Sequence, residues 1–145
     1  MDIDTEIDID KLIPHRDRMK LIDAVVSATE DAAVTSAVVT DRWPLFDGEG
    51  VGSLVLVELA AQTSAVSIGW KKLMAGDESG GKGWLVGIRT AHFFWETIPV
   101  GAEILTRSEI RFSMENYTEI MGTATVNGEP VGEVNLQVMR EESEP

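Results

Sequence analysis

The sequence predicts an α+β fold in which a curled antiparallel sheet wraps around one long buried helix. Residues 51–70 would place apolar side chains on every side of a helix, and Glu58 is the only charged residue among them. Six other segments alternate between apolar and polar residues, as strands with one buried face do. A helix that is apolar all round needs cover on most sides, which a curled sheet supplies.

The composition fits a single globular domain over residues 1–145, because 43% of the residues are hydrophobic and 26% are charged. There is no cysteine, which excludes disulfides and thiolate chemistry. The net charge of −13 argues against a nucleic-acid partner. Residues 1–10 hold five of the acids and residues 141–145 hold three, so we interpret both ends as solvated tails.

The first predicted strands are residues 20–27 and 33–40, which are rich in apolar and β-branched side chains. Residues 29–31 between them have the composition of a turn, so the two segments should form a hairpin. Residues 41–50 follow, and their Gly, Pro and Asp content is typical of a loop.

The predicted helix over residues 51–70 has plausible signals at both ends. Ser53 is expected to be its N-cap, and Lys71–Lys72 suit a helix C-terminus. The length approaches that of a membrane span. However, Glu58, Gln62 and the strand-rich remainder of the chain favour a core helix and no membrane span.

The second half of the chain predicts a series of long strands after a polar, glycine-rich loop over residues 75–83. The dipeptide Asn127-Gly128 is a strong signal for a two-residue hairpin. A curled antiparallel sheet around one buried helix is the hotdog fold, which is our prediction. The strands are expected over residues 84–95, 102–114, 118–126 and 131–139.

Nucleotide and metal sites are poorly supported. Residues 76–82 match the start of a phosphate-binding loop, but Gly83 stands where Ser or Thr is required. The glycines at 48, 50 and 52 precede the helix without a parallel βαβ unit. His15 and His92 are far apart and no metal-binding spacing occurs, so we expect neither a metal nor another cofactor.

Glu58 is the candidate for chemistry. An ionised carboxyl without a partner costs several kcal/mol when it is buried. Burial should therefore raise its pKa, so that it is protonated near neutrality and can donate a proton. The alternatives are a structural glutamate paired with an arginine, or one at a dimer seam.

Two segments resemble the β-hydroxyacyl-acyl-carrier-protein dehydratases, which are hotdog proteins. Residues 12–23, LIPHRDRMKLID, are similar to the family's opening signature around "PHR". Residues 57–62, VELAAQ, are similar to its central-helix motif "E-x-x-A-Q". A weaker likeness covers residues 87–101, and the pieces follow the family's order over most of residues 8–140.

The sequence departs from this family ahead of the helix. The usual motif there is Gly-His-Phe-Pro-Gly, and its histidine is the catalytic base. Residues 43–52 contain no histidine and form a shorter loop. In this respect the chain resembles a divergent branch associated with aryl-polyene pigment synthesis.

The resemblance implies a dehydration that needs an acid, a base and donors for the thioester oxygen. Glu58 is the expected acid, and Gln62, one turn further on, either orients its carboxyl or caps a buried contact. The backbone around Gly52 and Ser53, at the helix N-terminus, is expected to bind the oxyanion.

Two histidines could act with Glu58. The family's "PHR" loop lies beside the acyl tunnel, which makes His15 the candidate base; its other interpretation is a structural residue of the N-terminal loop. His92 lies next to Phe93 on a predicted strand. It is expected to be a sheet residue or, together with Phe93, part of the tunnel lining.

The expected function is that of a 3-hydroxyacyl-acyl-carrier-protein dehydratase, with the substrate carried on the phosphopantetheine of a carrier protein or on CoA. A homodimer, open to further assembly, is expected because a lone curled sheet leaves long edges exposed. The rivals are a hotdog thioesterase and a noncatalytic acyl-binding protein. No secretory signal is visible, so we expect a cytoplasmic protein. A basic patch near the tunnel mouth is expected from Arg16, Arg18, Lys71 and Lys72.

Overall fold

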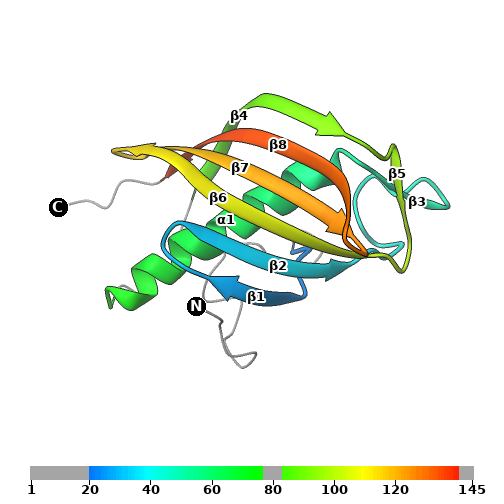
Figure 1. The fold of residues 1–145 in the computed structure, drawn as a ribbon, viewed down its shortest axis with the longest axis horizontal. Helices are drawn as coiled ribbons and strands as arrows, with labels where there is room; N and C mark the ends of the chain where they lie inside the picture. Colours follow the sequence, from blue (N-terminus) through cyan, green and yellow to red (C-terminus); the bar gives the residue numbers. More distant parts are fainter. Residues whose placement is uncertain (1–19, 77–82, 141–145) are drawn as a thin grey trace.

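The computed structural model describes residues 20–76 and 83–140, and in these ranges one six-stranded antiparallel sheet curls around a single helix (Figure 1). The helix is α1 (Val55–Met74). This is the arrangement of a hotdog fold, and the α+β prediction is confirmed. In spatial order the strands are β1 (Ala24–Ala28), β2 (Ala32–Val38), β6 (Glu103–Met114), β7 (Tyr117–Val126), β8 (Glu129–Arg140) and β4 (Gly83–Phe93).

A second, two-stranded sheet was not predicted. It pairs β3 (Gly50–Gly52) with β5 (Thr97–Pro99), so the end of the predicted loop over residues 41–50 belongs to a strand. Three residues are too few to show an alternating pattern, so neither strand could be predicted from the sequence. The acidic ends and most of the predicted loop over residues 75–83 lie outside the described residues.

The helix lies close against the concave side of the sheet. At Gly122 on β7, a Cβ would lie 2.6 Å from that of Ala60, so glycine permits this close approach. The Ser108 hydroxyl of β6 donates to the carbonyl of Ala60 at 2.8 Å. Buried hydroxyls of Thr35 and Thr63 bond to each other at 2.8 Å. Short side chains and paired hydroxyls thus hold α1 on the sheet.

The helix is not buried on all sides, which corrects the prediction. One stripe runs along it at the spacing of successive turns through Leu54, Glu58, Ala61 and Ala65. Leu54 is 54% exposed and the other three are half-buried. Ala61 packs against a buried cluster of α1 and β8 residues, and Ala91 of the edge strand β4 packs against the same cluster. Among the described residues, no helix is long and apolar enough to cross a membrane.

The edge strand β4 is long, apolar and open. Val86 is 55% exposed, and Leu85 and Ile88 are exposed as well. Its pairing with β8 shifts register twice, once between Leu85 and Gly87 and again between Ile88 and Thr90. Val86 and Arg89 are therefore the extra residues of two β-bulges. An exposed apolar edge of this length is typical of a strand that pairs with another chain.

Candidate active site

The loop ahead of α1 is held by one carboxylate. Asp47 Oδ1 accepts hydrogen bonds from the backbone N–H groups of Gly50 and Glu49, both at 3.0 Å. These two bonds, that of Gly50 first, hold the pKa of Asp47 below its ordinary value. The carboxylate is thus ionised near neutrality and fixes the turn that leads into β3.

The backbone donors that we expected to bind an oxyanion are already occupied. The N–H of Gly52 donates to the carbonyl of Leu45 at 3.1 Å, and that of Ser53 donates to the carbonyl of Glu96 at 3.0 Å. These bonds tie the helix entrance to its own loop and to the segment before β5. The assignment of these two N–H groups to the oxyanion is therefore wrong.

The start of α1 also differs from the prediction. The N-cap is Leu54 rather than Ser53, and no side chain caps the helix. The carbonyl of Ser53 instead accepts from the N–H of Leu56 at 2.9 Å. Within the described ranges, the N–H groups of Leu54 and Val55 have no hydrogen-bond acceptor. These two donors, at the positive end of the helix, remain available for a ligand oxygen.

Glu58 and Gln62 are in direct contact one turn apart on α1. Gln62 Nε2 donates to Glu58 Oε1 at 3.0 Å, and Gln62 Oε1 accepts the N–H of Leu21 at 2.9 Å. The backbone N–H can only donate, so it fixes which end of the amide is oxygen and aims the amide nitrogen at Glu58. Gln62 is fully buried, whereas Glu58 is half-buried on the open stripe. The buried amide of Gln62 therefore orients the Glu58 carboxyl, which is itself accessible to solvent.

The two candidate histidines are not placed beside Glu58 by the described residues. His15 lies outside them, but Leu21, six residues further on, is bonded to Gln62. His92 is exposed on β4 opposite Glu133. Because neighbouring Ala91 and Phe93 pair with the buried residues of β8, His92 projects from the face away from α1. Its assignment to substrate binding is therefore not supported within this chain.

Phe93, which was predicted to line the tunnel, lies at the end of β4. It pairs with Gly132 of β8, and a Cβ at Gly132 would come within 3.4 Å of the Phe93 ring and 2.6 Å of Leu56 on α1. The ring thus lies on the helix side of the sheet, near the first turn of α1. Phe93 is 37% exposed, so its ring also forms part of the surface there.

A hollow of about 340 Å³ opens at the opposite edge of the sheet, where β1 begins and β2 ends. Lys20, Arg42 and the buried Trp43 are among its lining residues. The Asp23 carboxylate at its rim accepts the N–H of Val38 at 2.7 Å. No local sequence pattern predicts this hollow, because its lining residues come from two separate segments, 20–23 and 38–43.

The remaining predictions concern metal binding and the basic patch. In the part of the chain that the structure describes, no three His, Asp or Glu side chains gather as a metal site. Lys71 is exposed at the end of α1 beside Lys72, whereas Arg16 and Arg18 of the predicted basic patch lie outside the described residues. The patch as a whole stays a prediction.

Known protein families and proteins resemble this chain along most of its length. Residues 7–144 match the family model described as ApeP-like, ApeP dehydratase. The chain is 30% identical over 135 residues to the 3-hydroxyacyl-[acyl-carrier-protein] dehydratase FabZ of Listeria welshimeri, covering 88% of this chain and 90% of that protein.

Solved structures show the same fold. The dehydratase heterocomplex ApeI:P from Xenorhabdus doucetiae is similar with a TM-score of 0.86 and 16% identity, over 94% of this chain and 93% of that one. A hypothetical thioesterase from Streptococcus pneumoniae, solved with coenzyme A, is similar with a TM-score of 0.63 and 11% identity, over 83% and 87%. At these identities the likeness concerns the hotdog fold alone.

Proposed function

Since this chain belongs to the ApeP-like dehydratase family and is a dehydratase-like enzyme of hotdog fold, we propose that it removes water from 3-hydroxyacyl thioesters with Glu58 as the proton donor. The observation that carries the proposal is the bonded sequence from Leu21 through Gln62 to Glu58. It holds a carboxyl in one orientation on the open stripe of an otherwise apolar helix, as a general acid requires.

The reaction needs three groups. A base takes the proton from the α-carbon, the electron pair forms the double bond, and the bond between the β-carbon and its hydroxyl breaks. Glu58 gives its proton to that hydroxyl, which leaves as water. The N–H groups of Leu54 and Val55 are suitably placed to bind the thioester oxygen as negative charge builds on it. For the base we propose His15, because its segment joins the site through Leu21.

The proposed acyl channel follows the open stripe of α1. Ala61 and Ala65 are small, half-buried side chains on the same stripe as Glu58, and Ala91 and Phe93 lie on the helix side of β4. The small alanine side chains and the flat ring of Phe93 fit an unbranched or conjugated acyl chain, which is compatible with aryl-polyene synthesis. The substrate would be carried on phosphopantetheine, and the elimination itself requires no other cofactor.

The free edge of β4 supports a homodimer. Two β4 strands that pair about a two-fold axis run antiparallel, so the start of one lies beside the end of the other. The N-terminus of α1 lies near Phe93, at the end of β4. Lys71–Lys72 of one copy would then approach the acidic loop ahead of the partner's α1, which carries Asp47 and Glu49. Opposite charges and covered apolar edges both favour this pairing.

We expect light scattering at micromolar concentration to give the mass of a dimer. A monomer would contradict the homodimer proposal. Because a similar chain occurs in a dehydratase heterocomplex, a second measurement adds a related hotdog chain. If a mixed dimer forms and the homodimer does not, the partner of this chain is the related hotdog chain and the homodimer proposal is wrong.

The activity is tested with 3-hydroxybutyryl and crotonyl thioesters of pantetheine and of a carrier protein. Reversible interconversion of the two, followed by absorbance of the conjugated thioester, is the expected result. Release of free thiol would instead assign a thioesterase, the class for which the S. pneumoniae protein of similar fold is named. Binding without either turnover would leave a noncatalytic acyl-binding protein.

The hollow beside Leu21 is the proposed contact for an acidic carrier. Lys20 and Arg42 line it, although the chain as a whole carries a charge of −13. Arg42→Glu should lower kcat/KM for carrier-bound substrate about three- to tenfold at low salt, because rim charges set association rates. Turnover of the pantetheine thioester should not change. Arg107→Glu on the outer face of the sheet is the control, and an equal loss in that variant would contradict this contact.

A further inference from the structure

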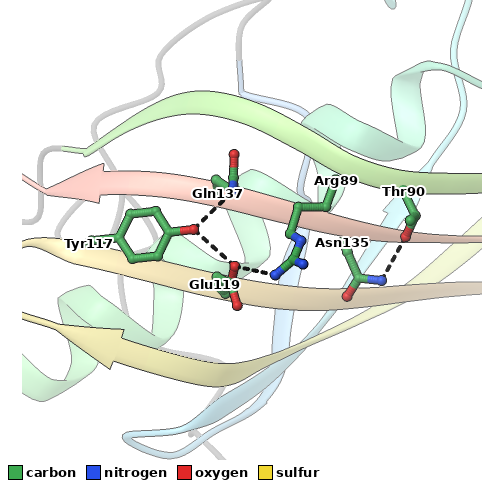
Figure 2. A network of polar contacts seen from close by, with 6 residues as sticks. All are labelled: Arg89, Thr90, Tyr117, Glu119, Asn135 and Gln137. Atoms are coloured by element: carbon green, nitrogen blue, oxygen red, sulfur yellow. Dashed lines mark hydrogen bonds and ion pairs between the residues drawn. The ribbon is translucent and has the colours of Figure 1, made fainter.

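Four side chains form a polar network on the outer face of the sheet, away from α1 (Figure 2). Arg89 Nη1 lies 2.7 Å from Glu119 Oε1, and the hydroxyl of Tyr117 donates to the same oxygen at 2.9 Å. Gln137 Nε2 donates to the Tyr117 hydroxyl at 2.9 Å. We call these four residues the outer strap. It joins the edge strand β4 to β7 across β8, which lies between them.

The outer strap lies over the two bulges of β4. Arg89 is itself the extra residue of the second bulge. Gly87 follows the first, and a Cβ there would lie 2.5 Å from Oε1 of Gln137, so the glutamine side chain covers this glycine. Next to the strap, Asn135 Nδ2 donates to the hydroxyl of Thr90 at 2.7 Å. The irregular part of the edge strand is thus fastened to its neighbours by side chains.

Near neutral pH, Glu119 and Tyr117 of the outer strap are in the protonation states that its hydrogen bonds require. The Tyr117 hydroxyl, followed by Arg89, lowers the pKa of the Glu119 carboxyl. Desolvation, followed by the bond to Glu119, raises the pKa of the Tyr117 hydroxyl. An ionised glutamate and a protonated tyrosine are the forms that these bonds require.

We infer that the outer strap is a positioning device for subunit pairing, which fixes the doubly bulged course of β4 so that its free edge is ready for a partner strand. The inference rests on the proposed dimer through β4. Bulges ordinarily weaken the pairing of an edge strand because they bend it. Without the strap, the strand would have to become ordered as the dimer forms, and that ordering opposes association.

Glu119→Gln tests this inference, with Glu109→Gln as the matched control. Glu109 also faces arginines on the outer sheet, at 3.9 Å from Arg107 and from Arg111, but it lies on β6, far from the edge. Sedimentation over a range of concentrations should give a dimer dissociation constant about three- to tenfold higher for Glu119→Gln than for the wild type. This is the size of effect expected from the loss of an exposed ion pair with its hydrogen bonds. The control should match the wild type.

Hydrogen exchange on the same samples measures the opening of individual strands. Amides of β4 should exchange faster in Glu119→Gln, whereas those of β1 at the other edge should not change. Tyr117→Phe keeps the ion pair and loses two hydrogen bonds, so it should shift dissociation in the same direction by less. A dimeric wild type with equal dissociation constants in both Glu variants overturns the strap and leaves the dimer intact. A monomeric wild type overturns both.

Discussion

Glu58→Gln should lower kcat by roughly two to four orders of magnitude while the protein folds normally. Glutamine keeps the size of the side chain and still has an oxygen that can accept from Gln62 Nε2, but it has no proton to transfer to the leaving hydroxyl. A positioned acid or base contributes about 10²- to 10⁴-fold. The measurement is the rate of interconversion of 3-hydroxybutyryl and crotonyl thioesters, together with thermal melting of the same preparation.

Glu96→Gln is the matched control for this variant. Glu96 lies in the exposed segment before β5, and only its backbone carbonyl is tied to the helix entrance, through the N–H of Ser53. Its substitution should leave both turnover and melting close to those of the wild type. If Glu58 is merely structural, its variant would lose about 1–3 kcal/mol of stability, as for a buried hydrogen bond, with turnover intact. That outcome would rule out the proposed mechanism.

The fold was predictable because its elements repeat a pattern over many residues. The helix was predicted over residues 51–70, where Glu58 is the only charge, and α1 forms four residues later, over Val55–Met74. The turn at Asn127-Gly128, where Asn127 has a φ of 52°, joins β7 and β8 as expected. Repeated local patterns of this kind do not depend on which distant residues they meet.

The site was predictable only in part because its remaining contacts are long-range. Glu58 and Gln62 were expected to meet, since residues four apart share a helix face. The bond from Leu21 to Gln62 joins positions 41 residues apart, and no local pattern records it. Ser53 has the chemistry of an N-cap, but its N–H is bonded to Glu96 and the helix begins one residue later. Tertiary contacts decided these details.

The open stripe on α1 has a similar cause. A sequence that is apolar all round does not distinguish a helix covered by its own sheet from one covered partly by a second chain. Leu54 and Ala65 therefore looked like fully buried positions, whereas Leu54 is exposed and Ala65 is half-buried. The exposed apolar edge of β4 fits the homodimer proposed above, in which a second copy would add to this cover.

Gln62→Leu should lower kcat about ten- to a hundredfold, because the Glu58 carboxyl loses the donor that orients it. A displacement of about 1 Å at a reacting group can cost a factor near 10². Leucine matches the buried volume but also leaves the N–H of Leu21 without its acceptor, so unfolding should become easier by about 1–3 kcal/mol. Turnover per folded molecule and denaturant unfolding are measured together.

Thr63→Val separates the two effects. Thr63 is equally buried on the next position of α1, and its hydroxyl bonds to Thr35 and to the carbonyl of Leu59 rather than to Glu58. Its loss should destabilise the fold by a similar amount, because a buried hydroxyl on β2 is left unpaired, while kcat of the folded protein stays unchanged. If Gln62→Leu behaves in the same way, with stability lost and kcat intact, Gln62 only supports the fold, and the orientation of Glu58 must come from another group.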